Sequence, residues 1–203
     1  MINILNMQVI LVKTIKKIKM KKIILLLLIT ISVKSFSQSF NGVEISGNIS
    51  AAVEKFKLKG FKLSKKEDNV YIMSGELFNE QVELFLFATP ITRQYAKCVV
   101  YFPESSWFSL KRDYNKFVNL FDEKYGTHTS QYEFFSEPYF EGDGYELSAL
   151  MLEKCIYITY WVQSRASMAV EISKYKQIKL IYENNAIMNL LQEERQKQQS
   201  RIF

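Results

Sequence analysis

The sequence offers few side chains of the types that perform catalysis. It has one histidine, His128, and no Gly-x-Ser-x-Gly motif that would mark a serine nucleophile. A catalytic histidine must lie beside a nucleophile and a carboxylate that orients it. His128 instead follows the expected end of a helix, where a positive charge is favoured and can be solvated. We therefore interpret His128 as a helix-end residue, and the sequence identifies no catalytic residue.

Carboxylates are most concentrated around Gly142 and Gly144, where the sequence has Glu137, Glu141, Asp143 and Glu146. Carboxylate-rich loops bind calcium, so Glu141, Asp143 and Glu146 are a candidate calcium site, although their spacing is not that of an EF-hand loop. Asp143 and Glu146 also fit a variant of the capping box at the start of a helix. We favour helix capping, and the sequence predicts neither a metal nor a cofactor.

Aromatic side chains give the one positive indication of a binding surface. In one expected strand Tyr157 and Trp161 share a face, and in another Phe85 and Phe87 lie opposite a row of aliphatic residues. Both faces of these strands are therefore apolar. One explanation is that helices cover both faces or that the strands are central in a sheet. The other is that the four aromatic residues form an exposed platform for a protein or glycan partner.

The two cysteines, Cys98 and Cys155, leave two possibilities open. In an oxidising compartment they could form a disulfide. A free cysteine also packs like a small apolar residue, so the alternative is a pair of buried free thiols.

The elements that position these side chains follow from hydrophobic periodicity. One helix is predicted from the N-cap residue Asn48 to Gly60, and a longer one from Ser105-Ser106 to Gly126. A short helix is predicted after Asp143, and a last helix after residues 184–185. Strands are predicted at 40–45, 61–63, 70–78, 81–88, 95–102, 132–135, 156–162, 168–172 and 177–182, with a polar turn at 65–69.

This order of elements predicts the α+β fold class, with antiparallel sheets and helices packed on one face. A helix followed by a meander of strands occurs twice, over about 48–102 and about 105–182. We interpret this as a degenerate helix-plus-meander duplication. We expect a single α+β domain over residues 38–191 and a polar C-terminal tail over 192–203.

Residues 1–37 are predicted to be a signal peptide. Lys21 and Lys22 precede the apolar run 23–33, and Ser35 and Ser37 supply the small residues of a cleavage site before Gln38. Since a basic cluster should open a signal peptide, we interpret residues 1–19 as an upstream extension, with the start at Met20; a long n-region is the alternative. An uncleaved membrane anchor is the alternative, but the apolar run is shorter than the roughly 20 residues that span a bilayer.

The leader also explains the basic character of the whole chain, which has a formal net charge of +6. Seven of its 27 Lys and Arg residues lie in residues 1–37, which leaves 20 against 21 acidic residues and a net charge of −1. A basic surface for nucleic acid is therefore not expected. We expect a periplasmic or secreted protein with no stable membrane anchor after cleavage.

Several short motifs carry a resemblance to a known family. They are the segments 40–47 (FNGVEISG), 59–61 (KGF), 100–103 (VYFP) followed by Trp107, 124–126 (KYG) and 152–155 (LEKC). In these segments the chain resembles a family of small secreted proteins common in Bacteroides-type bacteria. The resemblance implies an exported α+β domain and assigns no site residues. In outline, the helix-plus-meander order is also similar to inhibitor modules of the β-lactamase-inhibitor-protein type.

Two functions from different classes remain. The first is a non-enzymatic binding module of the periplasm or the outside of the cell, which takes a protein or glycan partner. The second is an envelope hydrolase with a carboxylate pair about 5–10 Å apart in a cleft. The sequence favours the first, because it has aromatic strands and an export signal and no catalytic motif.

Overall fold

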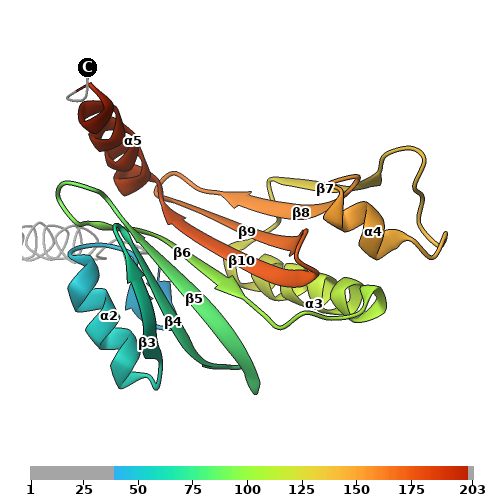
Figure 1. Ribbon diagram of the computed structural model, residues 1–203, viewed down its shortest axis with the longest axis horizontal. Coiled ribbons are helices and arrows are strands. Elements are labelled where there is room, and N and C mark those ends of the chain that lie inside the picture. Colours follow the sequence, from blue (N-terminus) through green and yellow to red (C-terminus); the bar gives the residue numbers. More distant parts are fainter. Residues whose placement is uncertain (1–38, 201–203) are drawn as a thin grey trace, which may run out of the picture. The chain divides into compact units, whose positions relative to one another are not determined.

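The computed structural model describes residues 39–200. The predicted signal peptide lies outside these residues. The dominant feature of the described chain is one sheet of eight antiparallel strands, with helices packed against it (Figure 1). The α+β class predicted from the sequence is confirmed.

The strands follow in the spatial order β3 (Lys62–Glu67), β4 (Val70–Leu77), β5 (Glu80–Ala88), β6 (Tyr95–Tyr101), β10 (Gln177–Asn184), β9 (Ala166–Ser173), β8 (Cys155–Val162) and β7 (Ser130–Phe135). A small hairpin, β1 (Ser39–Phe40) and β2 (Val43–Glu44), precedes them. The helices are α2 (Ile49–Leu58), α3 (Trp107–Tyr125), α4 (Glu146–Met151) and α5 (Asn185–Gln199).

The strand order divides the sheet into two halves with the same succession of elements. Helix α2 is followed by the meander β3–β6, and α3 is followed by β7–β10, with α4 inserted between β7 and β8. The last strands of the two meanders, β6 and β10, pair antiparallel at the centre, with Val99 opposite Ile181. An antiparallel seam between equivalent strands relates the halves by an approximate two-fold rotation. The helix-plus-meander repeat predicted from the sequence is thus present in the topology.

Local signals explain where the two long helices begin and end. The Asn48 side chain accepts a hydrogen bond from the Ser50 backbone N–H at 2.9 Å, as an N-cap should. Gly126 follows α3 with a φ of +87°, a conformation that favours glycine. The prediction of a polar turn over residues 65–69 is wrong, because β3 extends to Glu67. All six residues of β3 are exposed at the edge of the sheet, so its lysine-rich sequence shows no alternation of apolar and polar residues.

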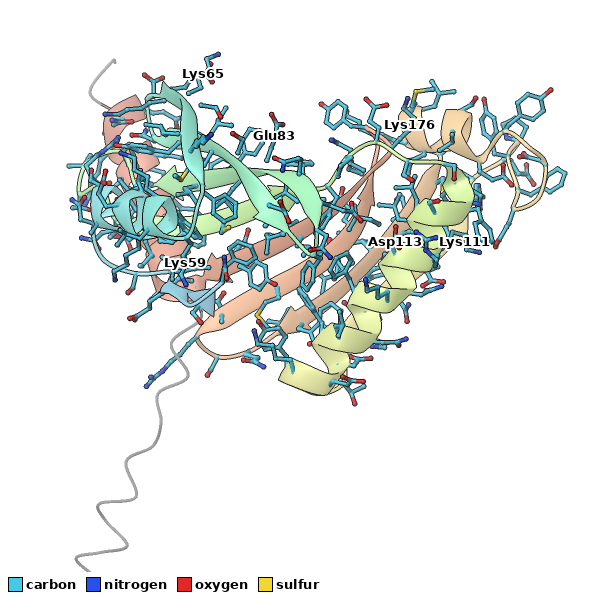
Figure 2. All side chains as sticks on the ribbon, turned by 90° about the horizontal axis from the view of Figure 1, so that it is seen from below. Lys59, Lys65, Glu83, Lys111, Asp113 and Lys176 are labelled. Atoms are coloured by element: carbon cyan, nitrogen blue, oxygen red, sulfur yellow. The ribbon has the colours of Figure 1, made fainter. Side chains whose placement is uncertain are left out.

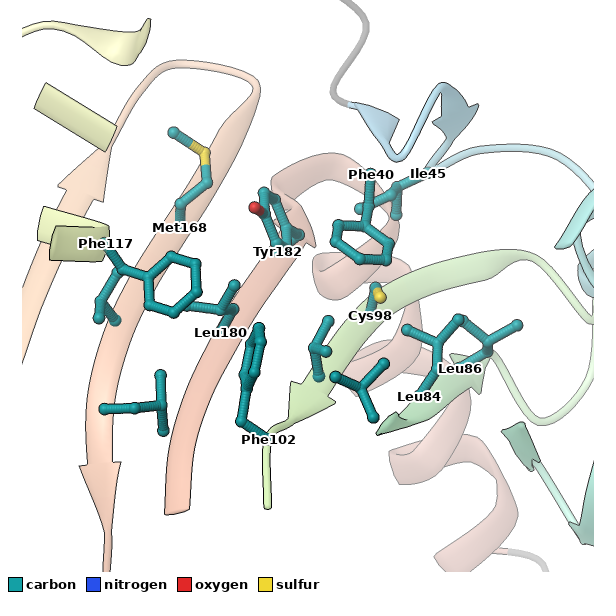
Figure 3. Close-up of a cluster of buried hydrophobic side chains, with 14 of the residues drawn as sticks. Phe40, Ile45, Leu84, Leu86, Cys98, Phe102, Phe117, Met168, Leu180 and Tyr182 are labelled. Carbon is teal, nitrogen blue, oxygen red and sulfur yellow. The ribbon is translucent and has the colours of Figure 1, made fainter. Parts of the chain in front are cut away.

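One core forms between the sheet and the helices α2 and α3 (Figure 3). At its centre, aromatic rings link the two halves of the molecule. The rings of Phe40 and Tyr182 are 5.1 Å apart, and those of Phe121 and Tyr182 are 5.6 Å apart. The β1–β2 hairpin thus supplies Phe40 to a cluster that α3 and the central strand β10 also share.

Helix α5 packs on the other face of the sheet, against β6 and β10. Cys98 and Val100 of β6 belong to the main core, so Val99 between them points to the opposite face. Val99 and Ala96 are nevertheless buried, as is Leu191 of α5. These three buried residues lie outside the main core cluster.

Candidate functional site

The structure separates the four aromatic residues that were predicted to form one platform. Tyr157 and Trp161 are only 4% and 2% exposed, because they lie under α3. The Tyr157 ring is 5.3 Å from that of Trp107, and the Trp161 ring is 5.1 Å from that of Phe121. The predicted binding role of Tyr157 and Trp161 is therefore wrong.

The polar atoms of these buried rings have partners within the core. The Trp161 Nε1–H donates to Asp122 and to the Gly126 carbonyl, each at 3.0 Å. Between the two rings in β8, Thr159 forms a 2.6 Å hydrogen bond with the hydroxyl of Tyr114. The alternation in β8 thus marks the core side of the strand rather than a platform.

Phe85 and Phe87 lie on the opposite face, which we call the open face: the side of the sheet away from α2 and α3. Strand register arranges its side chains in three rows. The middle row is Ile72, Phe85, Val99, Ile181, Ala169 and Tyr160. Directly opposed residues on one face are close enough for their side chains to interact. The middle row is therefore an uncharged apolar strip across six strands.

Charged residues occupy the rows on either side of this strip. One flanking row contains Glu83, Tyr101, Lys179 and Glu171, and the other contains Phe87, Lys97 and Glu183. Lys179 pairs with Glu171 at 2.7 Å and Lys97 with Glu183 at 2.6 Å, and all four side chains are about one quarter exposed. The open face thus combines an apolar centre with partly screened ion pairs.

Two hollows on this face meet at Tyr101 and Tyr175. One, of about 430 Å³, extends toward β8, and the other, of about 540 Å³, extends over β4 and β5 and includes Phe85 and Phe87. Tyr175 is 58% exposed in the turn between β9 and β10. Figure 2 shows Glu83 and Lys176 on this side of the sheet, whereas Lys111 and Asp113 project from α3. The open face is therefore hollowed on both sides of the central seam.

The cysteines are both buried and free, so of the two possibilities that the sequence left open the disulfide is not formed. Cys98 lies in β6 and Cys155 in β8, with β10 and β9 between them. Three strand spacings amount to about 14 Å, beyond the Cα separation of about 7 Å that a disulfide can bridge. Burial, followed by the charges of Glu141 and Glu146, raises the pKa of the Cys155 thiol to about 12. The alternative of buried free thiols is what the structure contains.

The carboxylates of the candidate calcium site are engaged with their own loop. Asp143 accepts hydrogen bonds from the backbone of Phe140 and Tyr145, and Glu146 accepts one from Gly142 at 3.0 Å. Glu141 pairs with Lys111, whose hydrogen bond lowers the pKa of the Glu141 carboxyl. In the described chain no cluster of three potential ligands could hold a metal ion. The site predicted at Glu141, Asp143 and Glu146 is therefore not assembled.

Asp143 does not cap α4 in the predicted way, because Tyr145 occupies the N-cap position and makes no side-chain cap. The two Asp143 oxygens instead hold the loop that leads into the helix. The prediction that Asp143 caps the helix is therefore wrong, because its hydrogen bonds lie within the preceding loop.

His128 lies just after α3, as expected, and is bound to Asp122. Its backbone N–H donates to Asp122 at 2.9 Å, and its Nδ1 lies 3.2 Å from the other carboxylate oxygen. Burial alone would raise the pKa of Asp122, but hydrogen bonds from His128 and Trp161 outweigh it and lower that pKa. Because Asp122 ties His128 and Trp161 to the end of α3, this group stabilises the helix terminus.

The carboxyl groups also bear on the hydrolase alternative. The described carboxyl groups whose pKa departs from its ordinary value are Asp122, Glu141, Glu153 and Glu194, and all four are lowered. A general acid in glycoside hydrolysis needs a raised pKa so that it carries a proton. These four groups are therefore suited to accepting hydrogen bonds rather than to donating a proton.

Glu194 is the one buried carboxylate that the sequence did not indicate. The predicted polar tail began at residue 192, yet α5 continues to Gln199 and Glu194 is only 2% exposed. Leu191, the other buried residue of α5, precedes it by three positions, so the two share a helix face. The spacing of Leu191 and Glu194 was the only available signal. It could not be recognised in the sequence, because Glu194 lies in a run of charged and amide residues.

Comparison of the chain with protein-family models, with curated proteins and with solved structures finds no match. The resemblance to small secreted proteins of Bacteroides-type bacteria therefore stays a prediction. Within residues 39–200, no helix has both the length and the apolar character that crossing a membrane requires.

Proposed function

We propose that the protein is an exported, non-enzymatic binding module that takes a protein partner on the open face of its sheet. Export is inferred from the leader sequence at residues 1–37. The observation that carries the proposal is the pair of hollows that meet at Tyr101 and Tyr175. They include residues from both ends of the middle row, Ile72 and Phe85 in one and Tyr160 in the other. Exposed apolar patches rimmed by polar residues are typical of interaction sites.

The chemistry of the face favours a protein over a glycan. Its middle row is mostly aliphatic, with Val99, Ile181 and Ala169 between Phe85 and Tyr160. Its rim carries cross-strand ion pairs, and an apolar centre with a polar rim is the usual composition of a protein interface.

The test is site-specific cross-linking on the mature chain. A photo-reactive side chain at position 175 should cross-link a defined protein of the envelope fraction, and Phe85→Ser should weaken binding of that purified protein about tenfold or more. A photo-reactive side chain at Phe108 is the matched control, because Phe108 is 79% exposed on α3. Equal labelling from both positions, or unchanged binding by Phe85→Ser, would reject the open face.

The envelope hydrolase remains the alternative, and the same purified chain tests it. Turnover of glycan or peptide libraries that is lost on substitution of one pair of acidic residues would favour the enzyme. Binding of a specific glycan that Phe85→Ser weakens in the same assay would show that the partner is a glycan rather than a protein.

A further inference from the structure

Helix α5 buries two side chains against the rest of the protein, and Ile187, Met188 and Leu190 in its first half are half-buried. Of its 15 residues only Leu191 and Glu194 are buried, and the remainder of its second half is polar and exposed. An isolated helix of this length is marginal in water, so its contacts with the sheet and loop decide whether it stays in place.

Glu194 occupies a binding site for a carboxylate in the loop between β5 and β6. Its carboxylate accepts hydrogen bonds from the backbone N–H of Ile91 at 2.6 Å, from that of Thr92 at 3.1 Å and from the Thr92 hydroxyl at 2.6 Å. Successive backbone N–H groups that converge in this way form an anion-binding nest. Three donors that converge on one carboxylate stabilise its negative charge and fix where it binds.

The loop is held in this form without α5. The Thr89 hydroxyl bonds to that of Thr92 at 2.9 Å and accepts the Gln94 backbone N–H at 2.9 Å. The Arg93 side chain donates to Asn69 and to the Tyr71 hydroxyl, which fixes the loop to the turn between β3 and β4. The loop around the nest thus has several bonds to the sheet and its turns that do not involve α5.

The apolar part of the same site lies in β6, on which α5 packs. Ala96 and Val99 are buried on the open face, and Val99 belongs to the apolar middle row. A helix that carries a leucine and a glutamate three residues apart can place the leucine on the apolar surface and the glutamate in the nest. Leu191 and Glu194 of α5 have this spacing.

The first turn of α5 is fixed separately from this site. Asn184 caps the helix and donates to the Ile45 carbonyl at 2.8 Å, and Asn185 donates to the Gln163 carbonyl at 2.8 Å. These bonds involve only the first turn of α5, so they would not be broken if its second half were displaced.

We propose that the nest at Ile91 and Thr92, with Ala96 and Val99, is a docking site for a partner helix that carries Leu-x-x-Glu, and that α5 is its internal occupant. This inference rests on the proposed function and names the partner chemistry at one end of the open face. A partner helix of this pattern replaces α5 and binds continuously with the apolar middle row. Helices that bind grooves through residues at i and i+3 are a common recognition mode.

The experiment uses a labelled peptide of residues 185–199 and the full mature chain. The peptide should bind the Glu194→Ala chain, whose own helix is released, about 10- to 100-fold more tightly than the wild-type chain, because a docked α5 reduces the fraction of free sites. The Glu193→Ala chain is the matched control and should behave like the wild type, because Glu193 is exposed on the same helix.

Peptide specificity gives the second measurement. A peptide with Glu194→Ala should bind the released chain about tenfold or more weakly than the wild-type peptide, since it leaves the nest unfilled. If the Glu194→Ala chain does not fold, Leu191→Ser releases the helix in its place. Equal peptide binding by all chains, or binding that ignores Glu194 of the peptide, would overturn the proposal. A stable dimer that exchanges α5 between two copies would also overturn it, because the occupant would then be a second copy.

These results are independent of the cross-linking at position 175. Peptide binding without a cross-linked partner would retain the docking site and reject the proposed function. A cross-linked partner without peptide binding would do the reverse.

Discussion

The two faces of the sheet are made by the same strands, yet they differ in whether they carry charged side chains. On the covered face, β6, β9 and β10 carry no charged side chain, and the apolar residues continue into the core under α2 and α3. On the open face the same strands carry two ion pairs beside the middle row. Burying charges completely is costly, so ion pairs remain where water still reaches them. Aromatic content alone therefore does not tell which face of a strand is covered, whereas the placement of charged side chains does.

The largest effect should come from the covered face. Trp161→Ala should lower the free energy of unfolding by about 3–5 kcal/mol, because it removes a large buried ring and one of the hydrogen-bond donors of Asp122. Denaturant unfolding of the mature chain measures this. Phe85→Ala is the comparison on the open face and should cost clearly less, because Phe85 is only half-buried. Equal losses would abolish the distinction between the two faces.

The next largest effect concerns Glu194, where the open face does bury a charge. Burial acts to raise the pKa of its carboxyl, but hydrogen bonds from Thr92 and Ile91 outweigh this and lower it. Glu194→Gln should therefore cost about 1–3 kcal/mol at pH 7. A lowered pKa means that this stability is present above the ordinary carboxyl pKa of about 4.3 and is lost as the pH falls through the lower value of the folded protein.

Unfolding at pH 7 and pH 3 measures how much stability Glu194 contributes at each pH. Hydrogen exchange of the α5 amides shows whether the loss occurs in this helix. The difference between wild type and Glu194→Gln should shrink at the lower pH. Glu193→Gln serves as control, and a pH dependence shared by both variants would exclude Glu194 as its source.

A smaller effect is expected for the ion pair between Lys179 and Glu171. A double-mutant cycle with Lys179→Met and Glu171→Gln should give a coupling of about 0.2–1 kcal/mol, because both groups are partly exposed. The coupling should fall on addition of salt. A coupling of several kcal/mol that salt does not change would show that this pair is buried like a core pair.

The smallest effect on stability should come from Tyr175. Since most of its side chain is exposed, Tyr175→Ser should change the free energy of unfolding by less than about 0.5 kcal/mol. The same variant should weaken binding of the cross-linked partner, which separates stability from recognition. Loss of both, or of neither, would remove Tyr175 from the proposed surface.

The sequence was sufficient for the fold class, for the repeated order of elements and for the ends of α2 and α3. Each of these depends on local signals such as Asn48, Gly126 and the period of apolar residues. It was not sufficient to decide which face of β8 is covered, because Tyr157 and Ile158 make both of its faces apolar. That choice depends on where α3 packs, and α3 is distant in the chain.

The candidate site was predicted in part, since Phe85 and Phe87 do lie on the open face. The rows that include Tyr101, Lys179 and Glu171 could not be predicted, because they require the register between β6 and β10. The role of Glu194 depends on a loop more than 100 positions earlier in the chain. The spacing of residues near Glu194 therefore could not predict that role.

The seam between β6 and β10 has a consequence for the order of folding. Within each half, strand neighbours are consecutive in the chain, so their contacts close short loops, which favours fast formation. Strand β6 is complete at Tyr101, whereas its partner begins only at Gln177. Until then the first half presents an unpaired strand whose only charged residue is Lys97. Such an edge can pair with other chains, and a single lysine offers limited protection. The interval before β10 arrives is therefore the period in which this protein is most prone to aggregation.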